Sequence, residues 1–177
     1  MARQSRVTRS RYVGTVENQG EARDLVKEPG DIAIVHRGRP RSLLINCPSG
    51  CGELQTVNLD TRVGPAWRVY RSRRGISVFP SIWKESGCES HFILWNDRVF
   101  WSSYDDDEFD LFESDSPLEG RILEILADGQ PRHYADIAES LDDTPWSVLG
   151  ICRRLVRQTS LHEDEGKRRG YFRAYRP

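Results

Sequence analysis

The hydrophobic pattern changes its period once along the chain, and this change limits the folds that the chain can adopt. Residues from about 11 to 102 are rich in β-branched and aromatic residues interrupted by Gly and Pro, which is typical of short strands. From residue 118 to residue 177 the apolar residues recur at helical spacing instead. A chain of 177 residues is long enough for two small domains. We therefore predict an α+β protein, with a β-rich domain at residues 1–104 and a helical domain at residues 118–177.

Candidate strands follow one another through the first region. They cover residues 12–16, 31–35, 42–46, 54–59, 67–70, 76–79, 91–95 and 98–101. Asn96 and Asp97 predict a hairpin turn, because both residue types tolerate a left-handed backbone. Residues 23–26 are predicted to begin a short helix. The aromatic residues are expected mainly in the core, although one or two are candidates for lining a groove: Trp67, Phe79, Trp83, Phe92, Trp95 and Trp101.

Residues 105–117 are acidic and end in Pro117, so they predict a linker between the domains. The alternative is an acidic strip that docks on a basic surface. Beyond it, three helices and then a β-hairpin are predicted, with Thr144 and Pro145 at the start of the third helix. This element order is that of a winged helix-turn-helix. Its predicted core consists of Leu118, Ile122, Ile125, Ile137, Leu141, Val148, Cys152 and Leu155.

Two closely spaced pairs of residues are typical of a metal site. Cys47 and Cys51 flank a Gly-containing turn, and Cys88 and His91 follow about 40 residues later. Without a secretory signal or an apolar run of about 18 residues, we expect a cytoplasmic protein with no membrane segment. In that reducing compartment such cysteines favour metal or catalysis over disulfides. Since zinc prefers thiolate and imidazole ligands in a tetrahedron, the four residues predict a structural zinc site.

Two alternatives to this ligand set stay open. In the first alternative, the four residues are unrelated buried side chains, because free Cys often packs as a small hydrophobe. In the other, His91 is free, and three cysteines hold the metal with water or another ligand. Cys152 stands alone on an apolar helix face and is expected to be plain core.

Residues 31–102 resemble a bacterial domain family. The resemblance rests on the pattern C-x-C-G-C-G-E, then W, PSI and C-x-S-H-[FY], which matches RSLLINCPSGCGE, GPAWRVY, SVFPSIW and GCESHFILWNDRVFW here. Ser49 stands where many relatives carry the middle cysteine, which favours Cys47, Cys51, Cys88 and His91 as the metal set. The family is associated with bacterial ubiquitin-like conjugation operons. The resemblance therefore implies a serine peptidase that trims a ubiquitin-like precursor, with that protein and its activating and conjugating enzymes as partners.

A serine peptidase needs a nucleophile and a base within hydrogen-bond reach. The candidate catalytic residues in the matching motifs are Ser81, Ser90 and His91. Ser90 and His91 are adjacent and would point to opposite faces of a strand, so Ser81 with His91 is the better pair. Glu53 or Asp60 is the candidate for orienting the histidine. The structural alternative is that Ser81 is a turn residue and that Ser90 caps the metal loop.

The helical region carries basic residues where a winged helix contacts DNA. They are Arg153, Arg154, Arg157, Lys167, Arg168 and Arg169. Acidic neighbours, and a formal net charge of −1 for the chain, argue against a strong phosphate field. Docking to a protein is the other role for this region. Beside the peptidase or binding module of a ubiquitin-like pathway, the alternative function is therefore a non-enzymatic, zinc-containing DNA-binding regulator or protein-docking module.

Overall fold

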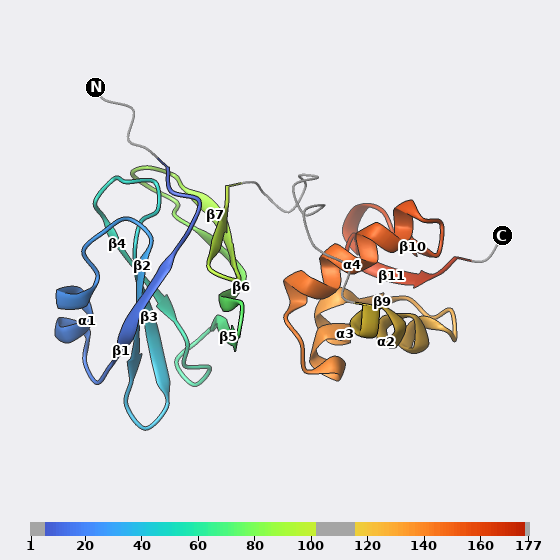
Figure 1. Ribbon diagram of the computed structural model, residues 1–177, viewed down its shortest axis with the longest axis horizontal. Coiled ribbons are helices and arrows are strands. Elements are labelled where there is room, and N and C mark those ends of the chain that lie inside the picture. The colour runs from blue at the N-terminus through green and yellow to red at the C-terminus, as the bar shows by residue number, and fades with distance from the viewer. Residues whose placement is uncertain (1–5, 102–115, 176–177) are drawn as a thin grey trace. The chain divides into compact units, whose positions relative to one another are not determined.

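The structure is a computed structural model and describes residues 6–101 and 116–175. The chain divides into two compact units, Met1–Asp105 and Asp106–Pro177, which are described separately below (Figure 1). The predicted linker at residues 105–117 lies outside the described residues up to residue 115. Among the described residues, no helix has the length and apolar character needed to span a membrane.

The first sheet of the first unit combines one parallel and two antiparallel pairings. Its strands are β1 (Arg11–Val16), β2 (Asp31–His36), β3 (Pro40–Asn46) and β4 (Leu54–Asn58), hydrogen-bonded in that order. β1 runs parallel to β2, and helix α1 (Gln19–Leu25) connects them. The short helix predicted near residue 23 therefore begins earlier, because Asn18 caps it by accepting from the Glu21 N–H.

The second sheet is an antiparallel meander. It consists of β5 (Arg68–Ser72), β6 (Gly75–Trp83), β7 (His91–Trp95) and β8 (Arg98–Phe100). Asn96 and Asp97 have φ values of 50° and 59°, so the hairpin predicted there is confirmed. β6 continues past the predicted end at Phe79. Pro80 is tolerated because it lies in a register shift and beyond the last residue paired with β5.

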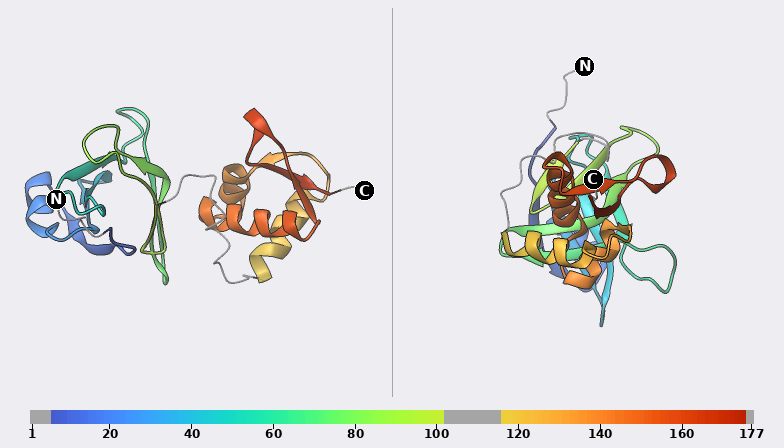
Figure 2. Two further views of the ribbon diagram at one scale, coloured as in Figure 1. Left: turned by 90° about the horizontal axis from the view of Figure 1, so that it is seen from above. Right: turned by 90° about the vertical axis from the view of Figure 1, so that its right-hand side faces the viewer.

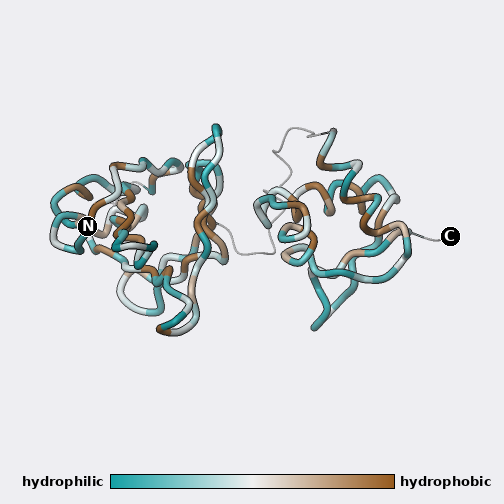
Figure 3. The backbone as a smooth tube through the Cα atoms, turned by 90° about the horizontal axis from the view of Figure 1, so that it is seen from below, coloured by the Kyte–Doolittle hydropathy of each residue, from teal (hydrophilic) through white to brown (hydrophobic). Residues whose placement is uncertain are grey.

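The core of this unit lies between the two sheets (Figure 2, Figure 3). Alternate residues of the first sheet face it, and the intervening residues face α1 on the other side (Figure 1). This explains why β2 is a nearly continuous apolar run. The buried residues between the sheets are Ile32, Ile34, Leu43, Ile45, Val57, Ile76, Val78, Ile82, Phe92, Leu94 and Val99.

Within residues 116–175, the second unit contains three α-helices and a small antiparallel sheet. The helices are α2 (Ser116–Leu126), α3 (Tyr134–Leu141) and α4 (Pro145–Arg157). The strands are β9 (Arg132–His133), β10 (Leu161–Glu163) and β11 (Tyr171–Ala174), with the 3-10 helix η2 (Gly166–Arg168) between the last two. The sheet order is β10-β11-β9. The predicted helices and hairpin are therefore present, whereas the two-residue β9 was missed.

The predicted core of the second unit is buried except for Ile125, which is half-buried. The adjacent Leu126 is fully buried instead. Trp146 and Phe172 also lie in this core, at 2% and 0% exposure, although the sequence pattern did not single them out. Cys152 is completely buried, and burial raises the pKa of its thiol well above the ordinary range, as befits a core residue.

Candidate active site and metal centre

Ser81 and His91 form a hydrogen-bonded pair on the β6–β7 hairpin. His91 lies directly opposite Trp83, so Ser81, two residues earlier on β6, is its diagonal neighbour on the same face. The His91 Nε2 atom is 2.9 Å from the Ser81 Oγ atom. This is the distance required between a nucleophile and its general base. The structure thus joins two of the three predicted catalytic residues.

Two tryptophans surround the Ser81–His91 pair. The Trp67 indole N–H donates to the Ser81 carbonyl oxygen at 3.1 Å. The Trp83 side chain is 63% exposed, and its ring centroid is 6.2 Å from that of His91. Ser81 and His91 themselves are only half-buried. The pair is therefore open to solvent beside the exposed Trp83. The sequence predicted that most aromatic residues lie in the core and that one or two line a groove, without choosing which.

The two acids expected to orient His91 are paired with cations elsewhere. Glu53 forms an ion pair with Lys84. Asp60 accepts from Arg41 at 2.5 Å and from Arg62 at 2.7 Å. Hydrogen bonds from Arg62 hold the pKa of Asp60 far below its usual range. Among the residues that the structure describes, neither Glu53 nor Asp60 is hydrogen-bonded to His91, whereas Ser81 is.

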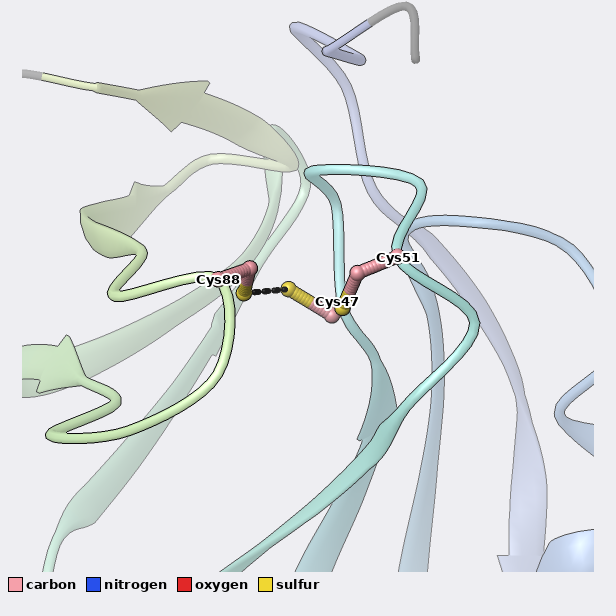
Figure 4. A group of neighbouring side chains, drawn as sticks. All are labelled: Cys47, Cys51 and Cys88. Carbon is pink, nitrogen blue, oxygen red and sulfur yellow. Dashed lines mark hydrogen bonds between the residues drawn. The ribbon is translucent and has the colours of Figure 1, made fainter. Parts of the chain in front are cut away.

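Three cysteines from two loops lie close together. Cys47 and Cys51 lie on the β3–β4 connection, and Cys88 lies on the β6–β7 connection (Figure 4). Their sulfur atoms all lie within 4.8 Å of one another, and the Cys47 and Cys88 sulfurs are 3.6 Å apart. The Cys47 side chain is buried, and the other two are partly buried. These thiols are positioned to bind one metal ion together.

Two serine hydroxyls complete the surroundings of the cysteines. The Ser49 Oγ atom is 3.1 Å from the Cys47 sulfur and accepts from the Cys51 N–H at 3.3 Å. Ser90 is 3% exposed, and its Oγ atom lies 3.3 Å from the Cys47 sulfur and 3.4 Å from the Cys88 sulfur. Ser90 therefore belongs to the cysteine cluster, and within the described part of the chain its hydroxyl is hydrogen-bonded to Cys47, Gln55 and Cys88 rather than to a histidine.

The alternation of side chains along the strand separates His91 from the cysteines. Ser90 faces the thiols, and the next residue, His91, faces Ser81. Among the described residues, the group of potential ligands contains Cys47, Cys51 and Cys88 but not His91. Of the four predicted zinc ligands, the structure thus brings three together and places the fourth, His91, against Ser81.

The surroundings of the cysteines favour the thiolate form of Cys88, which is the form that binds metal. Burial raises the pKa of Cys88, but hydrogen bonds from Ser49 and Ser90 outweigh it and lower that pKa to about 6. Burial raises the pKa of Cys51. Lys84 lies close by, and its pKa is raised by Glu53 and further by the charges of Cys88 and Cys51. A thiolate at Cys88 is the form that binds metal at neutral pH.

Arg153, Arg154 and Arg168 of the second unit each form an ion pair with an acid of the same unit. Arg154 pairs with Glu119 at 2.6 Å, and Arg153 pairs with Glu163 at 3.6 Å. Arg168 pairs with Asp164 at 3.2 Å. Arg157 and Arg169 also have interaction partners. Lys167 lies on η2. Three of the six basic residues predicted for DNA contact are thus paired with acids of the same unit.

Comparison with known proteins gives one match. No curated protein and no solved structure matches the chain. A family model does match, and the matched segment contains the three clustered cysteines and the Ser81–His91 pair. Residues 18–102 are similar to the family described as "Bacterial ubiquitination-like system serine protease (BubE)".

Proposed function

We propose that residues 18–102 form a serine peptidase domain that processes the ubiquitin-like protein of a bacterial ubiquitination-like system. The observation that carries this proposal is the 2.9 Å contact between His91 Nε2 and Ser81 Oγ, on a half-buried and accessible face. The match to the serine protease family supports the same class of reaction. The activating and conjugating enzymes of that system are the expected partners of the product.

The chemistry assigned to the pair is acyl transfer. Ser81 Oγ attacks the scissile carbonyl carbon while its proton moves to His91 Nε2. The tetrahedral intermediate collapses when His91 gives that proton to the leaving amine, and an ester to Ser81 is left. Water then attacks the ester, His91 takes its proton, and Ser81 is regenerated with release of the new C-terminus. His91 must be neutral and must accept through Nε2 in the first step.

A serine-directed fluorophosphonate tests the reactivity of Ser81 directly. We expect the wild-type protein to be labelled at Ser81, and Ser81→Ala and His91→Ala to lose labelling. Ser90→Ala is the matched control, because Ser90 faces the thiols and should leave labelling intact. Metal content and melting temperature should be unchanged in Ser81→Ala. Equal labelling of Ser81→Ala and wild type would remove Ser81 from the reaction.

We also propose that the cysteine cluster holds a structural zinc ion. Zinc–sulfur bonds of about 2.3 Å in a tetrahedron place sulfurs about 3.8 Å apart, and the Cys47–Cys88 separation of 3.6 Å fits this geometry. Three thiols supply three corners, and the Ser49 oxygen or a water molecule would supply the fourth. Elemental analysis of protein purified without added metal should find one zinc per chain. A folded, metal-free protein would contradict this proposal.

The metal would support catalysis through the chain that links the two sites. Cys88 precedes His91 by three residues, and the Lys84 N–H donates to the Ser90 carbonyl oxygen at 2.9 Å across the same connection. A metal bound to Cys88 would therefore fix the start of β7 and the position of His91. We expect zinc removal to reduce fluorophosphonate labelling although no cysteine contacts Ser81 or His91 among the described contacts.

We further propose that the second unit is a winged helix that docks a protein partner. Its order of helices and strands supports the fold, and the internal pairing of Arg153, Arg154 and Arg168 supports protein over DNA as the partner. A DNA-binding regulator is the competing function. Anisotropy of labelled duplex DNA decides between them: tight binding at about 0.15 M salt, falling steeply as salt rises, would favour DNA.

A further inference from the structure

The β6 strand has an open hydrogen-bonding edge beside the Ser81–His91 pair. β5 pairs with β6 only as far as Arg68, which lies opposite Phe79. One residue earlier, the Trp67 N–H donates instead to the Asn58 carbonyl oxygen at 2.8 Å. β5 therefore begins opposite Phe79 and does not extend alongside Ser81. Within residues 6–101 and 116–175, no strand pairs with residues 80–83 on that side of β6.

The backbone of Trp83 points toward this open edge. The Lys84 N–H donates to the Ser90 carbonyl oxygen, so Lys84 and Ser90 form a hydrogen-bonded pair. Hydrogen-bonded and non-hydrogen-bonded pairs alternate along antiparallel strands, so Trp83 and His91 form a non-hydrogen-bonded pair. The N–H and C=O groups of Trp83 are therefore directed away from β7, where a further strand would meet them.

Two tryptophans shape this edge: Trp67 occupies the hydrogen-bonding group at Ser81, and Trp83 offers an exposed apolar ring two residues further along. At Ser81 the outward carbonyl oxygen is already occupied, because it accepts the Trp67 indole N–H at 3.1 Å. At Trp83 the 63% exposed ring offers an apolar surface for the side chains of an added strand. A strand that pairs at Trp83 thus ends against the Trp67 indole. Its terminal peptide bond is thereby placed beside Ser81.

We infer that the substrate segment containing the scissile bond binds as an added β-strand on the β6 edge at Trp83. The occupant is an extended, unfolded stretch of polypeptide, such as the C-terminal tail of a folded protein. Only extended backbone matches the spacing of free N–H and C=O groups on a strand edge. This inference rests on the proposed peptidase function, since the position of Ser81 and His91 defines which segment must occupy the edge.

A selection for binding tests this inference without requiring turnover. The Ser81→Ala protein is immobilised, and binders are selected from a random library of linear dodecapeptides. The selected peptides are then measured against Trp83→Ala and Trp83→Pro, each made in the Ser81→Ala background. Trp83→Ala removes the ring but keeps the outward N–H. Trp83→Pro removes both, and it leaves the β6–β7 hydrogen bonds intact because the Trp83 N–H does not point to β7.

We expect both variants to weaken peptide binding, with Trp83→Pro about three- to tenfold weaker than Trp83→Ala, the factor for one net hydrogen bond. N-methylation along a selected peptide should weaken binding at every second residue. Equal binding by the two variants, no period in the methylation series, or no selectable peptide would overturn the inference.

Fluorophosphonate labelling of the wild-type protein at Ser81 tests the peptidase function independently of the added β-strand. Circular dichroism and the melting temperature of Trp83→Pro show whether the hairpin is folded. Labelling without edge binding would reject the added strand and keep the peptidase. Edge binding without labelling of the wild type would reject the peptidase and keep a peptide-binding edge. If Trp83→Pro fails to fold, the methylation series, which uses the intact Trp83, decides the inference.

Discussion

Asp60 carries a negative charge into a buried position, at 5% exposure, and two arginines make this tolerable. Arg62 donates through both its side chain and its backbone N–H, and Arg41 donates from β3. These contacts hold the pKa of Asp60 far below its ordinary value of 3.8. The carboxylate is therefore a structural link between β3 and the loop after β4. Among the described residues, its ion-pair partners are Arg41 and Arg62 rather than His91.

Replacing Asp60 with Asn tests this structural role through its pH dependence. The folded pKa of Asp60 is depressed, so its stabilising effect is complete above the unfolded value of 3.8 and is lost as pH falls toward the folded value. We expect Asp60→Asn to lower the melting temperature at pH 7. The difference from wild type should shrink as pH falls below about 4.

Labelling of Ser81 in the folded Asp60→Asn protein provides the second measurement. Normal labelling is expected, because Asp60 contacts Arg41 and Arg62 rather than His91. A folded Asp60→Asn protein that has lost labelling would restore Asp60 as the acid that orients the base.

Residue-level roles followed from the sequence only where strand geometry decided them. The side-chain alternation that excluded Ser90 from pairing with His91 left Ser81 as the better candidate among the motif serines, and the structure shows that contact. Spacing alone placed His91 among the metal ligands, because the motif does not reveal which way each side chain turns. The exposure of Trp83 could not be predicted from the sequence either, since it depends on the point at which β5 begins to pair with β6.

At the scale of elements, the tips of two hairpins are joined through Asp97 and Gly75. The Asp97 carboxylate accepts from the Ile76 N–H at 2.8 Å. Gly75 has φ = +124°, and a Cβ atom there would collide with the Asp97 carboxylate. Gly75 thus permits both the local backbone and the contact between the β5–β6 and β7–β8 turns.

Gly75→Ala should therefore destabilise the fold more than an equivalent change at an open turn. Gly38→Ala is the matched control, because Gly38 has φ = +69° with no atom within 4 Å of the added Cβ. We expect Gly38→Ala to cost about 1 kcal/mol from backbone strain alone. Gly75→Ala should cost about 1 kcal/mol more, because Asp97 must move and its hydrogen bond is lost. Urea unfolding measures both, and equal costs would mean that Asp97 moves without penalty.

The β3–β4 connection offers a sharper test of the metal centre. Ser49 lies on this loop with its Oγ atom 3.1 Å from the Cys47 sulfur. Ser49→Cys would add a fourth thiolate, so we expect tighter zinc binding in competition with a chelator. The cobalt-substituted variant should show stronger sulfur-to-metal absorption than wild type. Ser49→Ala is the control for loss of the hydroxyl, and unchanged spectra in Ser49→Cys would place the fourth ligand elsewhere.

The positions of the elements were predictable, but their partners were not. Residue alternation and turn chemistry are local, so strands such as β2 and β7 were found close to their observed bounds. The parallel pairing of β1 with β2 depends on α1 carrying the chain back across the sheet. Such a non-local pairing leaves no periodic signal. The continuation of β6 through Pro80 was missed for a related reason, because only the missing β5 partner makes the proline acceptable.

At the scale of the molecule, all candidate catalytic and metal-binding residues lie in the first unit. Ser81, His91 and the three clustered cysteines are within Met1–Asp105. The second unit has its own core, which includes Ile122, Leu149 and Phe172 at 0% exposure. Each unit thus contains what it needs to fold, and the chemistry is assigned to one of them.

Separate expression of residues 1–105 and 106–177 tests this division of roles. We expect each piece to unfold cooperatively, because each has a closed hydrophobic core of its own. Residues 1–105 should bind zinc with the full-length stoichiometry and label at Ser81 at the full-length rate. Residues 106–177 should bind no zinc. A slow-labelling first unit with normal zinc content would show that the second unit contributes to the active site, whereas loss of zinc would show that the first unit needs its neighbour to fold. Full labelling of the isolated first unit would leave the second unit the role of bringing the peptidase to its protein partner.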